Sequence, residues 1–193
     1  MTPPKNPHAE EYRRLWDTMK TDKGKEAVVA ARVAAIAKGR ERYEGITAKT
    51  GVPWEIIGII HNMECGLDFG CHLHNGDKLS KRTWQHPAGR PKTGMPPFTF
   101  DESAVDALQY DGLTKWVDWS IEGTLYKLEG YNGFGYRNVR NKDGTRGTDN
   151  PYLWAFSNHC DEIGKFTADS KFDPDAPTKQ IGVALLLRGL REL

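Results

Sequence analysis

The chain has 193 residues, 38% of them hydrophobic and 27% charged, with a formal net charge of +1. This length lets one domain, or one domain with two lobes, bury a core without disulfides or metals. The nearly balanced charge leaves no overall basic surface for nucleic acid. No apolar run approaches the roughly 20 residues of a membrane-spanning helix, so we expect no membrane insertion.

The N-terminal residues are polar and rich in proline, with no apolar stretch behind them. We therefore predict a disordered lead-in over residues 1–9, a single domain over residues 10–193, and synthesis in the cytoplasm without a signal peptide. The chain has 3 cysteines, an odd number that argues against a disulfide framework. Free thiols are expected, and a bridge between Cys65 and Cys71 under oxidising conditions is the alternative.

Two helices are predicted near the N-terminus. Apolar residues recur at helical spacing from Glu10, and Asp22-Lys23-Gly24 ends that pattern. The Ala-rich segment 25–43 predicts a second helix whose Lys and Arg side chains form a solvated face. Gly45-Ile46-Thr47 then interrupts the chain.

The third predicted helix ends in a carboxylate. Pro53 suits its first turn, Gly66 suits its C-terminal cap, and the sequence between them is apolar nearly all round, as in a buried helix. Glu64 lies in the last turn. Burial and the partial negative charge of a helix C-terminus both raise the pKa of a carboxyl group. A carboxyl that is still protonated near neutral pH can act as the general acid that glycosidic cleavage requires. The plain alternative for Glu64 is a solvated residue at a helix end.

The segment from residue 68 to residue 100 has no helical period and is rich in glycine and proline. It is long for a loop inside a compact domain, and loops of such length usually carry function or contain short strands. We predict a small β-hairpin or an ordered loop lobe here, packed beside the buried helix.

This segment also raises the question of a zinc site. His72 and His74 would face the same side of a strand, with Cys71 and Asp77 close in sequence. The spacing matches neither His-Glu-x-x-His nor a pair of Cys-x-x-Cys motifs. We therefore expect no metal and no cofactor, and a zinc-dependent peptidase or amidase is the less favoured alternative.

Helical spacing returns after Ser103 and again over residues 116–128. The glycine-aromatic segment 131–136 is predicted to be too flexible for a helix interior, and a polar loop is predicted over residues 138–150. A last helix is predicted over residues 178–193. The fold class is therefore mainly α (α+β), a helical lobe with a small β-hairpin or loop lobe.

Several motifs occur in a fixed order between about residues 52 and 180: His61-x-x-Glu64, His72-Leu73-His74-Asn75-Gly76-Asp77, Pro87-Ala88-Gly89-Arg90-Pro91, Tyr131-Asn132-Gly133-Phe134-Gly135-Tyr136 and Pro151-Tyr152-Leu153-Trp154. As an ordered set they resemble phage and prophage endolysins of the lysozyme-like superfamily, which cleave peptidoglycan. The resemblance implies one lysozyme-like catalytic domain whose catalytic Glu lies at the end of a buried helix, next to a small β lobe.

The resemblance also implies a reaction, in which Glu64 protonates the β-1,4 bond between N-acetylmuramic acid and N-acetylglucosamine. Asp77 and Thr83 follow it in the order seen in related phage lysozymes. If they hold a water on the far face of the sugar, the enzyme is an inverting hydrolase. Otherwise the 6-hydroxyl of the muramic acid attacks, and the enzyme is a lytic transglycosylase that leaves anhydromuramic ends. We expect hydrolysis.

The residues expected to bind substrate are His61, His74, Asn75, Arg90, Tyr131, Asn132 and Tyr136. His61 lies one turn before Glu64 and would orient its carboxyl or touch substrate; otherwise it is a core histidine. Arg90 would bind a carboxylate through a forked hydrogen bond, or else form an ion pair inside the lobe. The segment 131–136 would line a sugar groove, or else form a tight turn.

The implied partners are the glycan strands of peptidoglycan, which the protein would attack as a monomer. An endolysin without an export signal stays in the cytoplasm until a holin lets it reach the periplasm and cell wall. The other class of function is a wall-binding module without catalytic activity, which would use the same groove and would not need Glu64.

Overall fold

The computed structural model describes residues 6–140, 150–160, 163–168 and 171–193. In these ranges the protein is mainly helical, with eight α-helices, two short 3-10 helices and one antiparallel hairpin of two strands. The chain divides into two compact units, one made of residues 1–32 and 118–193 and the other of residues 33–117. The helix α2 (Glu26–Ala37) contains the boundary between them.

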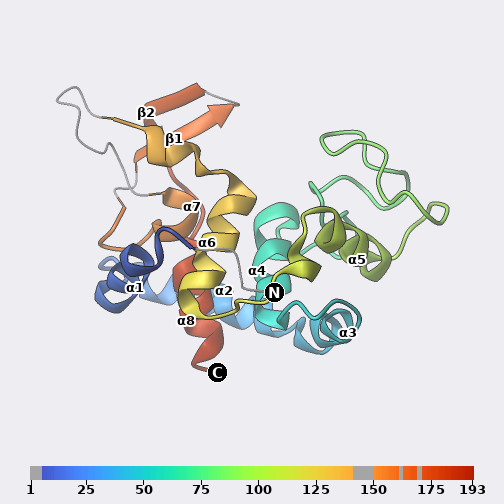
Figure 1. The fold of residues 1–193 in the computed structure, drawn as a ribbon, viewed down its shortest axis with the longest axis horizontal. Coiled ribbons are helices and arrows are strands. Elements are labelled where there is room, and N and C mark those ends of the chain that lie inside the picture. Colours follow the sequence, from blue (N-terminus) through green and yellow to red (C-terminus); the bar gives the residue numbers. More distant parts are fainter. Residues whose placement is uncertain (1–5, 141–149, 161–162, 169–170) are drawn as a thin grey trace. The chain divides into compact units, whose positions relative to one another are not determined.

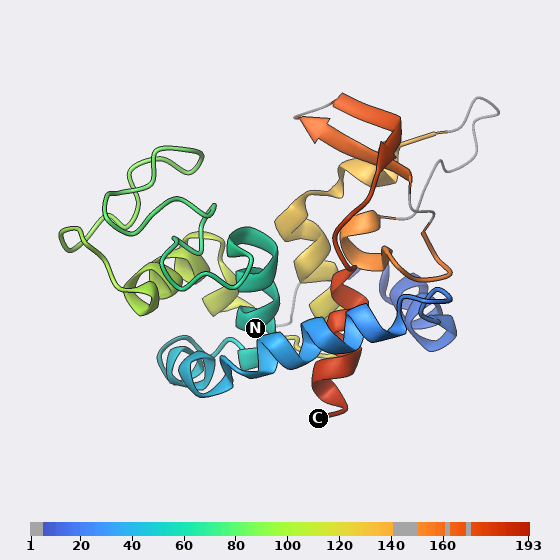
Figure 2. The ribbon, with the colours of Figure 1, turned by 180° about the vertical axis from the view of Figure 1, so that it is seen from behind.

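The unit of residues 33–117 is built around α4 (Trp54–Cys65). The helix α3 (Arg40–Thr50) packs against α4 and also against α5 (Phe100–Tyr110), and the 3-10 helix η1 (Leu113–Lys115) follows α5. Figures 1 and 2 show α3, α4 and α5 side by side from opposite directions. Isoleucines on every side of α4 are buried, which confirms the prediction of an internal helix.

The end of α4 has the predicted cap. Gly66 adopts a left-handed conformation with φ of +58°, and its N–H reaches the carbonyl oxygens of Asn62 and His61. A residue without a Cβ takes up this conformation with little strain. The helix therefore stops directly after Glu64 and Cys65.

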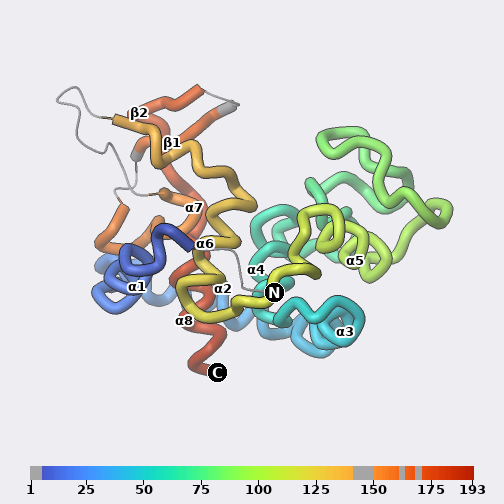
Figure 3. The backbone as a smooth tube through the Cα atoms, in the orientation of Figure 1, coloured from blue at the N-terminus to red at the C-terminus, as the bar shows by residue number. Residues whose placement is uncertain are grey.

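The chain between α4 and α5 is a long loop, traced in Figure 3. Every residue from 66 to 99 is described and none lies in a strand; a single bridge pairs Cys71 with Lys78. The hairpin predicted in this segment is therefore wrong, whereas the alternative of an ordered loop holds. The reason is that several backbone N–H groups of this loop donate to side-chain oxygens and not to a neighbouring strand. The prolines have no N–H to donate.

The other unit contains the remaining elements: α1 (Ala9–Thr18), α6 (Ile121–Asn132), η2 (Phe134–Asn138), α7 (Pro151–Trp154), β1 (Ile163–Ala168), β2 (Lys171–Pro177) and α8 (Val183–Arg191). The helix α1 packs on α6, and α7 packs on both α6 and α8. The two strands pair antiparallel, with Phe166 opposite Phe172. The rings of these two residues and of Tyr136 pack edge to face, so the hairpin is joined to η2 by aromatic contacts.

Three predicted helices differ from the structure in their bounds. The predicted helix 25–43 is two helices that part at Gly39, where a Cβ would lie 2.6 Å from the ring of Tyr43, and the second helix runs on through Gly45. The helix α6 begins at Ile121 and extends to Asn132, past the expected end. The last helix begins at Val183 and not at residue 178, because residues 178–182 connect β2 to α8.

The N-terminal prediction is partly wrong as well. Asn6 donates from its side chain to the carbonyl oxygen of Glu122 at 3.0 Å, and α1 begins at Ala9, so residues 6–9 are ordered. Residues 1–5 of the predicted lead-in and residues 141–149 of the predicted polar loop lie outside the described residues. Among the helices that are described, none is long and apolar enough to cross a membrane.

Candidate functional site

Glu64 lies half-buried in the last turn of α4. Burial and, to a lesser extent, the charge of Asp111 together raise its pKa to about 7. Within the described residues no hydrogen bond and no ion pair reaches its carboxyl group. A carboxyl in this setting is partly protonated near neutral pH.

The turn of residues 72–77 closes over this end of α4. Gly76 packs directly on the main chain, because a Cβ at that position would lie 2.7 Å from the carbonyl oxygen of Glu64. The thiol of Cys65 donates to the carbonyl oxygen of His72 at 3.2 Å, and the N–H of Gly76 donates to the same oxygen at 2.9 Å. The acid and the turn are therefore one packed structure.

Asp77 ends this turn, and its carboxylate organises the loop that follows. It accepts hydrogen bonds from the N–H of Trp84 at 2.9 Å, from the N–H of Gln85 at 3.0 Å and from the side-chain amide of Gln85 at 2.8 Å. Burial raises the pKa of Asp77, but the hydrogen bonds from Gln85 and Trp84 outweigh it and hold the pKa below its usual value. Asn75 supports the same turn, since its side-chain oxygen accepts from the N–H of Asp77 at 3.0 Å.

Thr83 is buried and also holds this loop. Its hydroxyl donates to the carbonyl oxygen of Pro87 and accepts from the N–H of Arg90 at 2.9 Å. Its backbone N–H donates to the carbonyl oxygen of Arg90 at 2.8 Å. The structure thus gives both Asp77 and Thr83 a full set of contacts within the loop.

His61 lies in the core of this unit. Its side chain is fully buried, its Nδ1 shares a hydrogen bond of 2.8 Å with the hydroxyl of Tyr43, and its ring packs 4.5 Å from Phe69 and 4.4 Å from Phe100. Burial lowers the pKa of His61, and the nearby Asp68 reverses only part of that effect. A neutral, enclosed imidazole matches the core alternative better than contact with substrate.

His74 and Arg90 meet at one carboxylate, that of Asp106 on α5. The Nε2 of His74 lies 2.9 Å from Asp106, and the guanidinium of Arg90 forms two hydrogen bonds to it, at 2.8 and 2.9 Å. Arg90 therefore forms the ion pair inside the lobe that was the alternative to a substrate contact. The spacing of Asp106 gave no sign of this role in the sequence.

His72 is buried beside this group, with both ring nitrogens in hydrogen bonds. Nδ1 lies 2.8 Å from the hydroxyl of Ser103, and Nε2 lies 2.8 Å from the carbonyl oxygen of Lys81. In the part of the chain that the structure describes, no three His, Cys, Asp or Glu side chains are grouped so that they could hold a metal ion. The cysteines are free; Cys71 donates to a carboxylate oxygen of Asp68 at 3.2 Å rather than pairing with Cys65.

The remaining predicted residues belong to the other unit. Tyr131 and Asn132 end α6, and Tyr136 lies in η2, where its buried hydroxyl accepts from the N–H of Phe166 at 3.1 Å. Asn132 and Tyr136 share a cavity of about 200 Å³, which Tyr131 does not line. The other lining residues are Pro151, Tyr152, Lys165, Phe166, Thr178 and Gln180.

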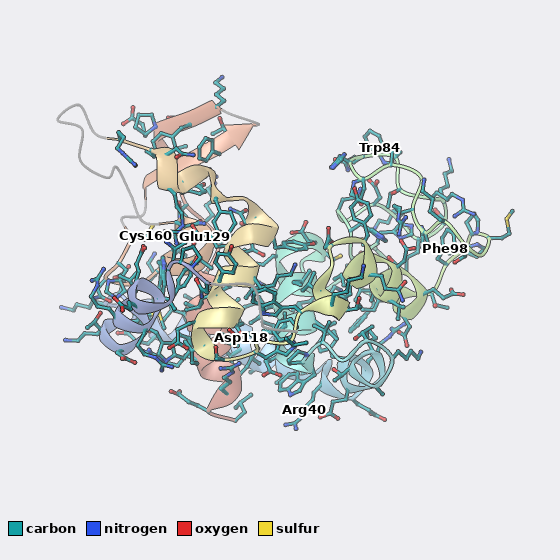
Figure 4. The ribbon with its side chains drawn as sticks, viewed as in Figure 1. Arg40, Trp84, Phe98, Asp118, Glu129 and Cys160 are labelled. Carbon is teal, nitrogen blue, oxygen red and sulfur yellow. The ribbon has the colours of Figure 1, made fainter. Side chains whose placement is uncertain are left out.

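This unit also holds a buried ionic group around Glu129, labelled in Figure 4. Glu129 accepts hydrogen bonds from the hydroxyl of Tyr12 and from Arg137, the latter at 2.6 Å. Arg137 in turn reaches Glu11 at 3.0 Å. These contacts tie α1, α6 and η2 together, which accounts for a charged residue that is 1% exposed.

Trp84 is a residue that the motifs did not single out. It is 78% exposed, although the loop that carries it is well ordered by Asp77 and Thr83. The amino-acid sequence offers only a weak sign of this exposure. The residues on either side of Trp84 are polar, so nothing nearby suggests that it belongs to the core.

Chemically, the unit of residues 33–117 offers a carboxyl that can be protonated near neutral pH, set beside a rigid polar turn. Such a group can donate a proton to a leaving oxygen. Compared with known protein families, with curated proteins and with solved structures, the chain matches none of them.

Proposed function

We propose that the protein is a glycosidase that cleaves the β-1,4 bond between N-acetylmuramic acid and N-acetylglucosamine in peptidoglycan, with Glu64 as the general acid. The observation that carries this proposal is the pKa of about 7 for a half-buried carboxyl at the end of an internal helix. The choice of peptidoglycan as substrate rests on the resemblance of the ordered motifs to endolysins. Release from the cytoplasm by a holin belongs to the same proposal.

In this mechanism the protonated carboxyl of Glu64 donates its proton to the bridging oxygen as the glycosidic bond breaks. Positive charge develops on the anomeric carbon of the muramic acid, in an oxocarbenium-like transition state. In the transglycosylase, the carboxylate left on Glu64 is then the base that accepts the proton of the attacking 6-hydroxyl. In an inverting hydrolase, a second carboxylate accepts the proton of the attacking water instead.

The identity of the attacking group separates two candidate functions. An inverting hydrolase needs a second carboxylate that is free to activate a water. Asp77 already accepts three hydrogen bonds within its loop, and the hydroxyl of Thr83 donates to the carbonyl oxygen of Pro87. These contacts favour the lytic transglycosylase, in which the 6-hydroxyl of the muramic acid attacks and the product carries an anhydromuramic end.

The test is mass spectrometry of the fragments that the protein releases from purified peptidoglycan, compared with the fragments released by Glu64→Gln. Glu44→Gln is a matched control, because Glu44 lies on α3 and forms an exposed ion pair with Arg40. We expect the control to be active and Glu64→Gln to be inactive. Reducing muramic ends identify a hydrolase, and anhydromuramic ends identify a transglycosylase.

Two results would overturn the glycosidase. One is full activity of Glu64→Gln on the glycan. The other is cleavage of amide bonds that stops when metal is chelated and returns with zinc, which would establish the peptidase or amidase alternative.

A further inference from the structure

Trp84 is unusual in being both highly exposed and firmly held. Its side chain is 78% exposed, and Figure 4 shows it at the outer edge of the loop between α4 and α5. An indole ring carries one of the largest apolar surfaces of any side chain, and most of it faces solvent here. A scattered exposed apolar residue is common, so exposure alone identifies nothing.

The backbone around Trp84 shows that the exposure is built. The N–H of Trp84 donates to the buried carboxylate of Asp77 at 2.9 Å. The preceding Thr83 exchanges backbone hydrogen bonds with Arg90 and Gly89, at 2.8 and 2.7 Å. A buried carboxylate and a buried hydroxyl thus fix the main chain on both sides of an indole that contributes nothing to the core.

The two residues that follow Trp84 in sequence are polar. Gln85 and His86 beside it are exposed, and the side chain of Asn75 reaches the carbonyl oxygen of His86 at 3.4 Å. A flat apolar ring that is followed in sequence by an exposed amide and an exposed imidazole suits a sugar, whose ring presents a face of C–H groups and a rim of hydroxyls. The ring then packs on the apolar face while the polar groups bond the rim.

Trp84 is also connected to the proposed acid within the same unit. Asp77 holds the backbone of Trp84, and the turn that Asp77 ends rests through Gly76 on the main chain of Glu64. The main chains of Trp84 and Glu64 are therefore both in contact with the turn of residues 72–77.

We propose that Trp84 is a sugar-stacking platform that binds the glycan strand beside Glu64. This inference rests on the proposed function for the identity of the ligand. It assigns a binding role to a residue outside the group of side chains expected to bind substrate.

The test is a nuclear magnetic resonance titration of the full chain carrying Glu64→Gln, so that no bond is cleaved. The probe is the soluble tetramer of N-acetylglucosamine, and the signal is the indole N–H of Trp84, assigned from its loss in Trp84→Phe. We expect this signal to shift on titration. We expect Trp84→Ala to weaken binding about tenfold and Trp84→Phe to keep most of the affinity.

Met95→Ala is the matched control, because Met95 lies in the same loop and is 80% exposed. It should leave binding unchanged. Equal binding by Trp84→Ala, or an equal loss in Met95→Ala, would overturn the inference. So would a shift of the Trp84 signal by vesicles of phosphatidylethanolamine and phosphatidylglycerol but not by the tetramer, since the indole would then be a membrane contact.

The two proposals fail in different ways. If Glu64→Gln stops lysis and Trp84→Ala binds the tetramer normally, the glycosidase stands and the platform is wrong. If Glu64→Gln lyses walls normally and Trp84→Ala loses the tetramer, the platform stands on a protein that is not a Glu64-dependent glycosidase.

Discussion

The α-carbon of Gly76 faces the main-chain carbonyl oxygen of Glu64 so closely that a Cβ would lie 2.7 Å from it. Gly76 also has a φ of +78°, which residues with a side chain rarely adopt. Both the left-handed backbone and the absence of a side chain are needed for the turn of residues 72–77 to rest on the end of α4. The packing of this turn against the proposed acid thus depends on a glycine 12 residues further along the chain.

The first prediction is that Gly76→Ala lowers the free energy of unfolding by more than a Gly→Ala substitution at another left-handed glycine does. Strain at positive φ costs about 1 kcal/mol, and an unrelieved clash with the main chain adds roughly 1–3 kcal/mol. Gly51→Ala is the control, because Gly51 has a φ of +73° with no atom within 4 Å of the added Cβ. Urea unfolding of both variants measures the difference; equal losses would show that the turn moves away freely.

The second prediction concerns Asp77. Asn has a single acceptor oxygen, so Asp77→Asn should lose at least one of the hydrogen bonds from Trp84 and Gln85 and destabilise the protein by about 1–3 kcal/mol at pH 7. The lowered pKa of Asp77 means that its ionised form stabilises the fold above the ordinary pKa of 3.8. That stabilisation fades as the pH falls through the lowered value, so the two proteins should differ less at acidic pH.

Activity gives the same experiment a second readout. If Asp77 only builds the loop, the activity of Asp77→Asn should follow the fraction of folded protein as temperature is varied. Complete inactivity in a sample shown by circular dichroism to be fully folded would instead make Asp77 a catalytic group, as the inverting mechanism requires.

These residues show how far the sequence alone could lead. Helical period, Pro53 and Gly66 are local signals, so α4 and the place of Glu64 at its end were predicted correctly. The hydrogen bond between Asp77 and Gln85 and the pairing of Arg90 with Asp106 join residues 8 and 16 positions apart, and the periodicities of helices and strands carry no information about them.

The β-hairpin was predicted in the wrong segment. Residues 68–100 had the length and turn residues of a β lobe, yet their backbone is held by buried side chains such as Asp77 and Thr83. The strands lie at 163–168 and 171–177, where Gly164 and Pro174 obscure the alternating pattern. Glycine and proline therefore suggested a hairpin in the first segment and concealed the strands in the second.

The third prediction is that Asp106→Asn is strongly destabilising. Asp106 accepts both hydrogen bonds from the guanidinium of Arg90 and one from His74, and the Arg90 and Asp106 side chains are only 16% and 14% exposed. Removing the negative charge leaves a largely buried arginine without compensation, at a cost of roughly 2–4 kcal/mol. Chemical denaturation at pH 7 measures this loss.

Asp101→Asn supplies the comparison for that variant. Asp101 pairs with Arg42 at 2.7 Å, but these side chains are 32% and 42% exposed, so its loss should cost no more than about 1 kcal/mol. A loss for Asp106→Asn as small as this would mean that the loop is anchored elsewhere. A double-mutant cycle with Arg90→Met would then measure the interaction energy between Arg90 and Asp106.

The fourth prediction is the pH dependence of activity. A general acid works only while protonated, so the rate should be high below the pKa of about 7 for Glu64 and fall roughly tenfold per pH unit well above it. Initial rates of fragment release from peptidoglycan between pH 5 and 9 measure this limb. A rate that is level from pH 6 to 9 would remove Glu64 from the role of acid.

The fifth prediction links the same carboxyl to stability. Its pKa is about 7 in the folded protein against an ordinary 4.5, so the folded state binds the proton more tightly and stability declines as the pH rises through this window. Glu64→Gln resembles the protonated form at every pH. It should therefore be more stable than the wild type at pH 8, by up to about 3 kcal/mol, and equal to it near pH 4. Thermal unfolding at both pH values tests this, and a variant that is less stable at pH 8 would contradict the raised pKa of Glu64.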